Sequence, residues 1–188
     1  MSIDKDRELA VSAKSGDAAA FEALVTRYET PVFRYLLARL GHRADAEDAL
    51  QEAFVSAYRY LQSFNVEQSF RAWIYTIAIR EAGRIGKRQT RRRWVERLFA
   101  GSGEPVDDTD PVGDHGVWAL ARQALPVQQF TALWLYYHEQ WDVGEVAAGL
   151  GRSSSWVKVN LHRARGVLRK RLQPASPALD LESEGKRV

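Results

Sequence analysis

Residues 141–171 form the part of the sequence that most constrains the fold. A short apolar segment, WDVGEVAAGL, is followed by Gly151 and then by a basic segment, RSSSWVKVNLHRARGVLRKR. In the second segment, apolar residues recur at the spacing of one helix face: Val157, Leu161, Ala164 and Leu168. Two helices joined at a glycine, the second of them basic, are typical of a helix-turn-helix, whose second helix enters the major groove of DNA. The pattern therefore predicts a helical unit that binds duplex DNA.

The rest of the chain is also helical in pattern, and no stretch alternates apolar and polar residues as a strand would. Asp17 is placed to cap one helix, and Pro31 suits the first turn of the next, which we expect to end at Gly41. A long helix begins at Asp45, and after a polar break Ser69 caps another. We therefore predict an all-α fold of two small helical domains.

Residues 100–114 differ from their surroundings because they combine glycine, proline and acidic residues, which oppose helix and core formation. We interpret this segment as a flexible acidic linker that could rest against basic surfaces when DNA is absent. The expected organisation is a first domain over 1–99, the linker over 100–114, a second domain over 115–173 and a polar tail over 174–188.

The formal net charge is only +3, but the basic residues are clustered in two segments of the sequence. The first comprises Arg80, Arg84, Lys87, Arg88, Arg91, Arg92, Arg93 and Arg97. The second comprises Lys158, Arg163, Arg165, Arg169, Lys170 and Arg171. Two separate basic clusters beside a helix-turn-helix indicate two contacts with a polyanion, although either alone could be a solvated helix face.

Several classes of protein are excluded or disfavoured by composition. The chain has no cysteine, which rules out disulfides, thiolate metal sites and a cysteine nucleophile. The first residues are charged and the longest apolar run is short, so we expect neither a secretory signal nor membrane insertion. No glycine-rich phosphate loop is present, and we expect no cofactor and no enzymatic activity. A cytoplasmic location is the default expectation.

The predicted recognition helix divides into an inward apolar face and an outward face. In its first half the outward residues are Lys158, Val159, His162 and Arg163, which could contact base edges or phosphates. The serine run that includes Ser154 and Ser155 offers an N-cap and phosphate contacts. Trp156 could pack on the turn or on a DNA sugar. Each of these could also be an ordinary surface residue.

On the helix that begins at Asp45, the side chains of Asp45, Asp48 and Glu52 lie on one face, with Gln51 beside them. Acidic side chains in a DNA-binding protein do not face DNA. They could bind a basic protein surface, remain solvated, or hold a metal ion as in a nuclease. We rank protein binding first and a metal last, because no convergent ligand or candidate base is evident elsewhere in the sequence.

Residues 63–93 interleave aromatic and basic residues in the way that single-stranded nucleic acid is gripped, with bases stacked on rings and the backbone held by arginines. A core position is favoured for Phe70 and Trp73, while Phe64 and Tyr75 could be core or base-stacking residues. The polar loop over 65–69 could form a pocket for a flipped base.

These three constellations, in this order, resemble the extracytoplasmic-function (ECF) group of bacterial sigma factors, over about residues 9–172. Residues 45–54, DAEDALQEAF, resemble the family's polymerase-binding helix. Residues 70–78, FRAWIYTIA, resemble its −10 element helix, and residues 157–165, VKVNLHRAR, resemble its −35 element helix.

The resemblance implies sigma regions 2 and 4, which contact the β′ clamp and the β flap of core RNA polymerase, together with promoter DNA and an anti-sigma factor as partners. The polymerase contacts would be Asp45, Asp48, Gln51 and Glu52. The melted −10 strand would meet Phe64, Asn65, Ser69, Arg71, Tyr75, Arg80, Arg84, Lys87 and Arg88. The −35 duplex would meet Ser154, Ser155, Trp156, Lys158, Val159, His162 and Arg163.

The sequence departs from the family pattern at several of these positions. Arg80 stands where the family often has Asn, and a guanidinium cannot accept a hydrogen bond as an amide oxygen does. Trp156, Val159 and Asn160 stand where Thr, Ser and Arg are frequent, so the promoter preference need not be the usual one. The alternatives are an ordinary helix-turn-helix repressor or activator and, more remotely, a metal-dependent nuclease.

Overall fold

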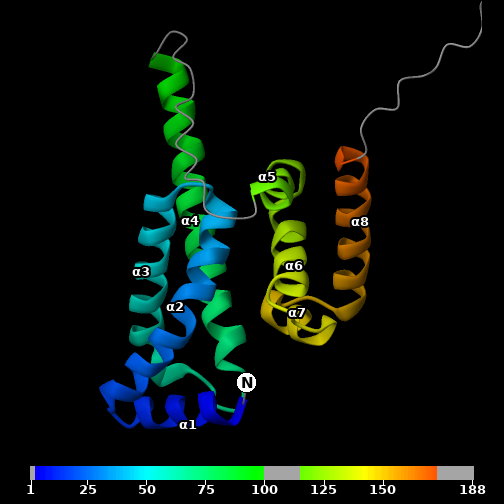
Figure 1. Ribbon diagram of the computed structural model, residues 1–188. Helices are drawn as coiled ribbons and strands as arrows, with labels where there is room; N and C mark the ends of the chain where they lie inside the picture. Colours follow the sequence, from blue (N-terminus) through cyan, green and yellow to red (C-terminus); the bar gives the residue numbers. More distant parts are fainter. Residues whose placement is uncertain (1–2, 100–114, 173–188) are drawn as a thin grey trace, which may run out of the picture.

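The structure, a computed structural model, describes residues 3–99 and 115–172 of the 188-residue chain, with side chains placed for 5–88 and 116–172. Every element in these ranges is helical, which confirms the predicted all-α class (Figure 1). None of the described helices is both long and apolar enough to cross a membrane. The expectations for the linker, the tail and the side chains of Arg91, Arg92, Arg93 and Arg97 lie outside the described residues.

The N-terminal half contains four α-helices: α1 (Ile3–Lys14), α2 (Ala18–Leu40), α3 (Arg43–Tyr60) and α4 (Phe70–Phe99). A short 3₁₀ helix, Leu61–Ser63, follows α3. Figure 1 shows α2, α3 and α4 side by side, with α1 crossing one end of the bundle. The buried face of α3 consists of small residues, which let α3 pack closely on its neighbours: Ala46, Ala49, Ala53 and Ala57.

The prediction of a helix break before Pro31 was wrong, because α2 continues through it. Proline removes one backbone donor from a helix interior. Here the residues on either side of Pro31 are anchored in the core, with Tyr28 and Val32 almost fully buried, and this packing holds the helix together. The predicted ends of α2 are confirmed. The Asp17 carboxylate accepts hydrogen bonds from two backbone amides, and Gly41 ends the helix with φ of 78°.

The C-terminal half contains α5 (His115–Ala124), α6 (Val127–Tyr137), α7 (Val143–Leu150) and α8 (Ser154–Leu172). Asp142 and Glu145 form a reciprocal capping box at the start of α7. Gly151 has φ of 60°, in the left-handed region that glycine enters without strain, and it turns the chain into α8. The helix-turn-helix is therefore α7 and α8, as predicted, and α6 separates α8 from the N-terminal half (Figure 1).

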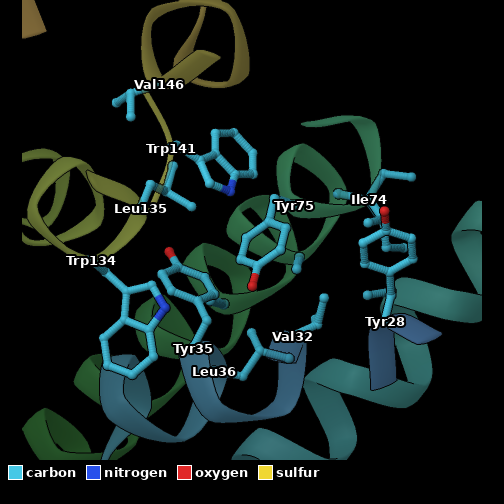
Figure 2. Close-up of a cluster of buried hydrophobic side chains, with 14 of the residues drawn as sticks. Tyr28, Val32, Tyr35, Leu36, Ile74, Tyr75, Trp134, Leu135, Trp141 and Val146 are labelled. Carbon is cyan, nitrogen blue, oxygen red and sulfur yellow. The ribbon is translucent and has the colours of Figure 1, made fainter. Parts of the chain in front are cut away.

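The two halves share one hydrophobic core, which the sequence did not indicate. Helices α2 and α4 pack against α5, α6 and α7, and the buried residues of both halves form one continuous cluster. Figure 2 shows the centre of this junction, where Tyr35 and Tyr75 meet Trp134 and Trp141. The ring centres of Tyr75 and Trp141 lie 5.3 Å apart.

Candidate nucleic-acid and partner interfaces

The outward face of α8 carries the side chains predicted to contact duplex DNA. Lys158, Val159, His162 and Arg163 are all exposed, as are Ser154 and Ser155. The opposite face is buried at the positions that the spacing predicted: Val157, Leu161, Ala164 and Leu168. The helix thus exposes two basic side chains, Lys158 and Arg163, on the side opposite its buried stripe.

Side-chain hydrogen bonds fix the start of α8. The Trp156 amide donates to the Ser153 hydroxyl at 3.1 Å, which caps the helix. Asn160, where the family frequently has Arg, is buried. Its amide nitrogen donates to the Trp156 carbonyl oxygen at 2.9 Å, and Gln129 donates to its amide oxygen at 3.3 Å. Asn160 therefore ties α8 to α6 and helps to set the angle at which the recognition helix stands.

Trp156 is half-buried and packs against the turn. This is one of the two positions expected from the sequence, the other being a contact with a DNA sugar. The Arg152 guanidinium lies over the Trp156 ring, 5.4 Å from its centre. Both residues line a cleft of about 430 Å³ where the helix-turn-helix meets α4. Thr76, Ile79 and Arg80 form the α4 side of this cleft.

The acidic face predicted on α3 is present. Asp48, Gln51 and Glu52 are exposed, and Asp45 is partly exposed. Two large apolar side chains continue the face toward the end of α3, with Val55 44% exposed and Tyr58 63% exposed. The exposed side of α3 therefore combines carboxylates with two large apolar side chains.

Among the described residues, no group of three or more His, Asp or Glu side chains converges closely enough to hold a metal ion. Asp45, Asp48 and Glu52 all lie on the single helix α3. The geometry therefore gives no support to the nuclease alternative.

Two aromatic residues predicted to meet the melted strand lie in the core instead. Phe64 is 2% exposed and packs against Phe70 and Trp73, with ring centres 5.6 and 4.6 Å away. Tyr75 is 1% exposed and is enclosed between Tyr35 and the second half of the chain. Neither ring offers a face to an unpaired base in this conformation, because neighbouring rings already cover it.

The loop between the 3₁₀ helix and α4 is folded on its own hydrogen bonds. The Asn65 side-chain oxygen accepts from the Glu67 amide at 3.0 Å, and the Ser69 hydroxyl accepts from the Ala72 amide at 3.3 Å. The second bond is the helix cap that the sequence predicted. Lys14 donates to the Phe64 carbonyl oxygen at 2.7 Å and fixes the loop to α1. The loop is thus held by hydrogen bonds to α1, to α4 and within itself.

The basic residues of α4 fall into two groups. Arg80, Arg84, Lys87 and Arg88 are exposed, and Arg84 also pairs with the nearly buried Glu81 at 2.6 Å. Arg71 instead faces the second half. Its guanidinium lies 2.7 Å from the Glu145 carboxylate and 4.8 Å from the centre of the Trp141 ring.

Sequence reasoning missed the junction residues, among them Tyr35, Thr131, Trp134, Trp141 and Glu145. One signal was available. Residues 130–141 carry five large aromatic side chains: Phe130, Trp134, Tyr136, Tyr137 and Trp141. Aromatic side chains bury large areas, so such a cluster is compatible with packing against more than one neighbouring element.

Comparison with known proteins identifies both halves. The family profile for Sigma-70 region 2 matches residues 24–95, and that for Sigma-70, region 4 matches residues 120–168. The chain is 31% identical over 182 residues to the ECF RNA polymerase sigma-E factor of Haemophilus influenzae, covering 90% of this chain and 96% of that protein. It is 32% identical over 172 residues to the ECF RNA polymerase sigma factor SigM of Mycobacterium tuberculosis, covering 87% and 82%.

Solved structures agree with this assignment. CnrH, solved in complex with the cytosolic domain of CnrY, superposes with a TM-score of 0.71 at 25% identity, over 92% of this chain and 99% of CnrH. The sigma factor RpoE of Bartonella quintana, solved with the anti-sigma factor NepR, has the same fold, with a TM-score of 0.65 at 20% identity over 83% and 98%. The paired region 2 and region 4 matches, the full-length relatives and the shared fold show that the chain belongs to the ECF sigma factors of the sigma-70 family.

Proposed function

We propose that the chain is an alternative sigma factor that binds core RNA polymerase and directs it to a specific set of promoters. The observation that carries the proposal is the separation of three exposed surfaces on one helical scaffold. These are the acidic face of α3, the basic side chains of α4 and the outward face of α8. Each has the chemistry that one step of promoter-specific initiation requires.

The acidic face of α3 is assigned to the polymerase. Asp48, Gln51 and Glu52 would meet basic and polar groups of the β′ clamp, with Asp45 at the edge of the contact. Val55 and Tyr58 extend the same face with apolar area, which a stable protein interface needs in addition to charge. Region 4 would contact the β flap.

The outward face of α8 is assigned to the −35 duplex. Lys158 and Arg163 are long and exposed, so they can reach guanine edges or phosphates, while Val159 can touch a thymine methyl group. His162 stands between them on the same face. Ser154 and Ser155, at the start of the helix, are placed for phosphate contacts.

The basic side chains of α4 are assigned to the backbone of the melted −10 strand. Arg80, Arg84, Lys87 and Arg88 are exposed and follow one another along the helix, as successive phosphates would require. Binding energy would drive melting, so no catalytic residue is needed. A protein that acts on the chromosome within the holoenzyme works in the cytoplasm.

We also propose an anti-sigma factor as a regulatory partner. One structural neighbour, RpoE of Bartonella quintana, was solved with the anti-sigma factor NepR, and another, CnrH, was solved with the cytosolic domain of CnrY. This chain shares their fold over most of its length, and its two halves lie close enough together for one partner to contact both.

Transcription in vitro with purified core polymerase tests the proposal. Core polymerase plus the chain should start transcripts at a defined set of sites in a genomic library, and core polymerase alone should not. If the chain binds an isolated duplex tightly as a dimer on two-fold half-sites and never confers start-site selection, the repressor alternative is correct instead.

A further inference from the structure

The cleft between α4 and the helix-turn-helix has the dimensions of a small-ligand site. Its volume of about 430 Å³ falls within the range of about 300–1,000 Å³ that such sites occupy. Helix α4 forms one wall, and α6 together with the helix-turn-helix forms the other. A ligand in the cleft would therefore contact both halves of the chain.

The cleft carries positive charge that no carboxylate balances. Arg80 lines it from α4 and Arg152 lines it from the turn before α8, and none of the residues that the structure places around it is acidic. Neither guanidinium forms an ion pair with a described residue, whereas Arg71 and Arg84, also on α4, each have a carboxylate partner. Two unpaired guanidinium groups at one cleft favour an anionic ligand, and phosphate matches their geometry.

Arg152 is already positioned by its neighbours. Its guanidinium lies over the Trp156 ring, 5.4 Å from the ring centre, and its Nη2 lies 3.5 Å from Oε1 of Gln128. Gln128 belongs to α6, so side chains of two different helices orient the same cation. A side chain that is oriented beforehand loses less conformational freedom when it binds a ligand.

Another part of the wall is apolar. Ile79, Leu150 and Trp156 line the cleft, and each of these side chains is only partly exposed. Apolar and indole surfaces favour a planar ring over a fully hydrated ligand. The Gln128 amide nitrogen can donate a hydrogen bond to an acceptor on the edge of such a ring. The cleft thus combines a site for an anion with a site for a heterocyclic ring.

We propose that this cleft binds a free nucleoside monophosphate, with its phosphate at Arg80 and Arg152 and its base against the apolar wall. The proposal goes beyond the three surfaces of the proposed function, and only Arg80 belongs to both. Because the lining residues come from both halves, the bound nucleotide would also stabilise their packing by its binding free energy.

Calorimetric titration of the full chain with AMP tests the proposal. AMP should bind saturably. Adenosine, which lacks the anion, and inorganic phosphate, which lacks the ring, should each bind about tenfold more weakly or less. Saturating AMP should also raise the midpoint of thermal unfolding. Absence of saturable binding, or equal affinities for AMP and inorganic phosphate, would overturn the inference.

A charge variant tests the role of the positioned cation. Arg152→Gln removes the guanidinium and keeps a polar side chain, and it should weaken AMP binding about tenfold or more. Arg34→Gln makes the same change in net charge at an exposed position on α2 and should bind AMP normally. If the two variants lose affinity equally, AMP is attracted by the net charge of the chain rather than by the cleft, and the inference fails.

A variant that fills the cleft separates a free nucleotide from a DNA strand. Ala148 is exposed and lines the cleft, so Ala148→Leu should weaken AMP binding about fivefold or more, whereas Ala148→Ser should bind AMP normally. The affinity of Ala148→Leu for single-stranded DNA of mixed sequence should be unchanged, because Arg84, Lys87 and Arg88 do not line the cleft. An equal loss for AMP and DNA would make the cleft part of the strand surface and would overturn the assignment to a free ligand.

Discussion

The hydroxyl groups of Tyr35 and Thr131 lie 3.1 Å apart, although 96 residues separate them in the sequence. Both side chains are 1% exposed, and they come from opposite halves of the molecule. The Thr131 hydroxyl donates to the Val127 carbonyl oxygen at 3.0 Å, so the Tyr35 hydroxyl must donate to Thr131. This hydrogen bond fixes α6 on α2 at the centre of the shared core.

The direction of this hydrogen bond predicts unequal costs for its two deletions. Tyr35→Phe removes a donor and leaves the Thr131 hydroxyl bonded to Val127, so the free energy of unfolding should fall by about 1 kcal/mol. Thr131→Val leaves the buried Tyr35 hydroxyl without an acceptor and should cost about 1–3 kcal/mol. Urea unfolding followed by circular dichroism measures both. Equal costs would contradict the assigned direction.

Alkaline pH should destabilise the junction. Burial raises the pKa of Tyr35 to about 12, and burial together with the Glu139 carboxylate raises the pKa of Tyr75 well above its ordinary range. An unfolded tyrosine ionises near pH 10. The folded chain therefore holds these protons more tightly, and the stability they contribute is complete below about pH 10 and declines as the pH rises toward 12.

The slope of this decline should approach about 1.4 kcal/mol per pH unit for each such tyrosine. Alkaline unfolding with tyrosinate absorbance recorded alongside circular dichroism measures it. The Tyr35→Phe variant should show a shallower dependence over the same interval. An identical dependence in the variant would show that Tyr35 does not contribute.

The helices could be predicted from the sequence because their signals are local. Asp17, Gly41, Ser69 and Gly151 each satisfy a backbone requirement at a helix end, and that requirement depends only on nearby residues. At Pro31 the sequence predicted a helix boundary that is absent from the structure. Burial of the neighbouring residues keeps the helix continuous there, and this burial depends on the tertiary structure.

In the candidate site too, the features with a local signal could be predicted, and those that depend on tertiary packing could not. The outward face of α8 followed from helical period alone, since a buried stripe determines which residues remain outside. Phe64 and Tyr75 could not be assigned, because an aromatic residue among arginines has the same local pattern whether it stacks on bases or on other rings. The packing of the halves on each other, which settles the position of Tyr75, has no local signal.

Charge reversal on α3 should weaken association with core polymerase. Asp48→Lys changes an exposed carboxylate at the centre of the proposed interface and should lower the affinity by about tenfold or more, since like charges then face each other. Co-purification and competition binding measure the effect. Glu22→Lys, the same reversal on α2, should bind normally, and both variants should keep wild-type circular dichroism. A normal affinity for Asp48→Lys would reassign this face to solvent.

Two glycine-to-alanine changes should have opposite effects on stability. A β-carbon at Gly149 would meet the Trp141 ring at 2.8 Å, so Gly149→Ala should lower the free energy of unfolding by about 1–3 kcal/mol. Gly166 lies in α8 with open space around it, and Gly166→Ala should raise the stability by about 0.5–1 kcal/mol through helix propensity. Thermal unfolding measures both, and a neutral Gly149→Ala would show that the ring can move aside.

Base recognition and backbone contact on α8 should be separable by two arginine variants. Arg163 lies in the first turns of the outward face, and its removal should cost about 1–3 kcal/mol on the cognate −35 sequence and little on scrambled sequences. Arg169 lies six residues further along α8 and is also exposed. Arg169→Ala should weaken binding equally on all sequences and lower the salt dependence by about one counterion. Holoenzyme binding to matched promoters over a range of salt distinguishes the two, and an equal loss for Arg163→Ala on every sequence would make Arg163 a phosphate contact.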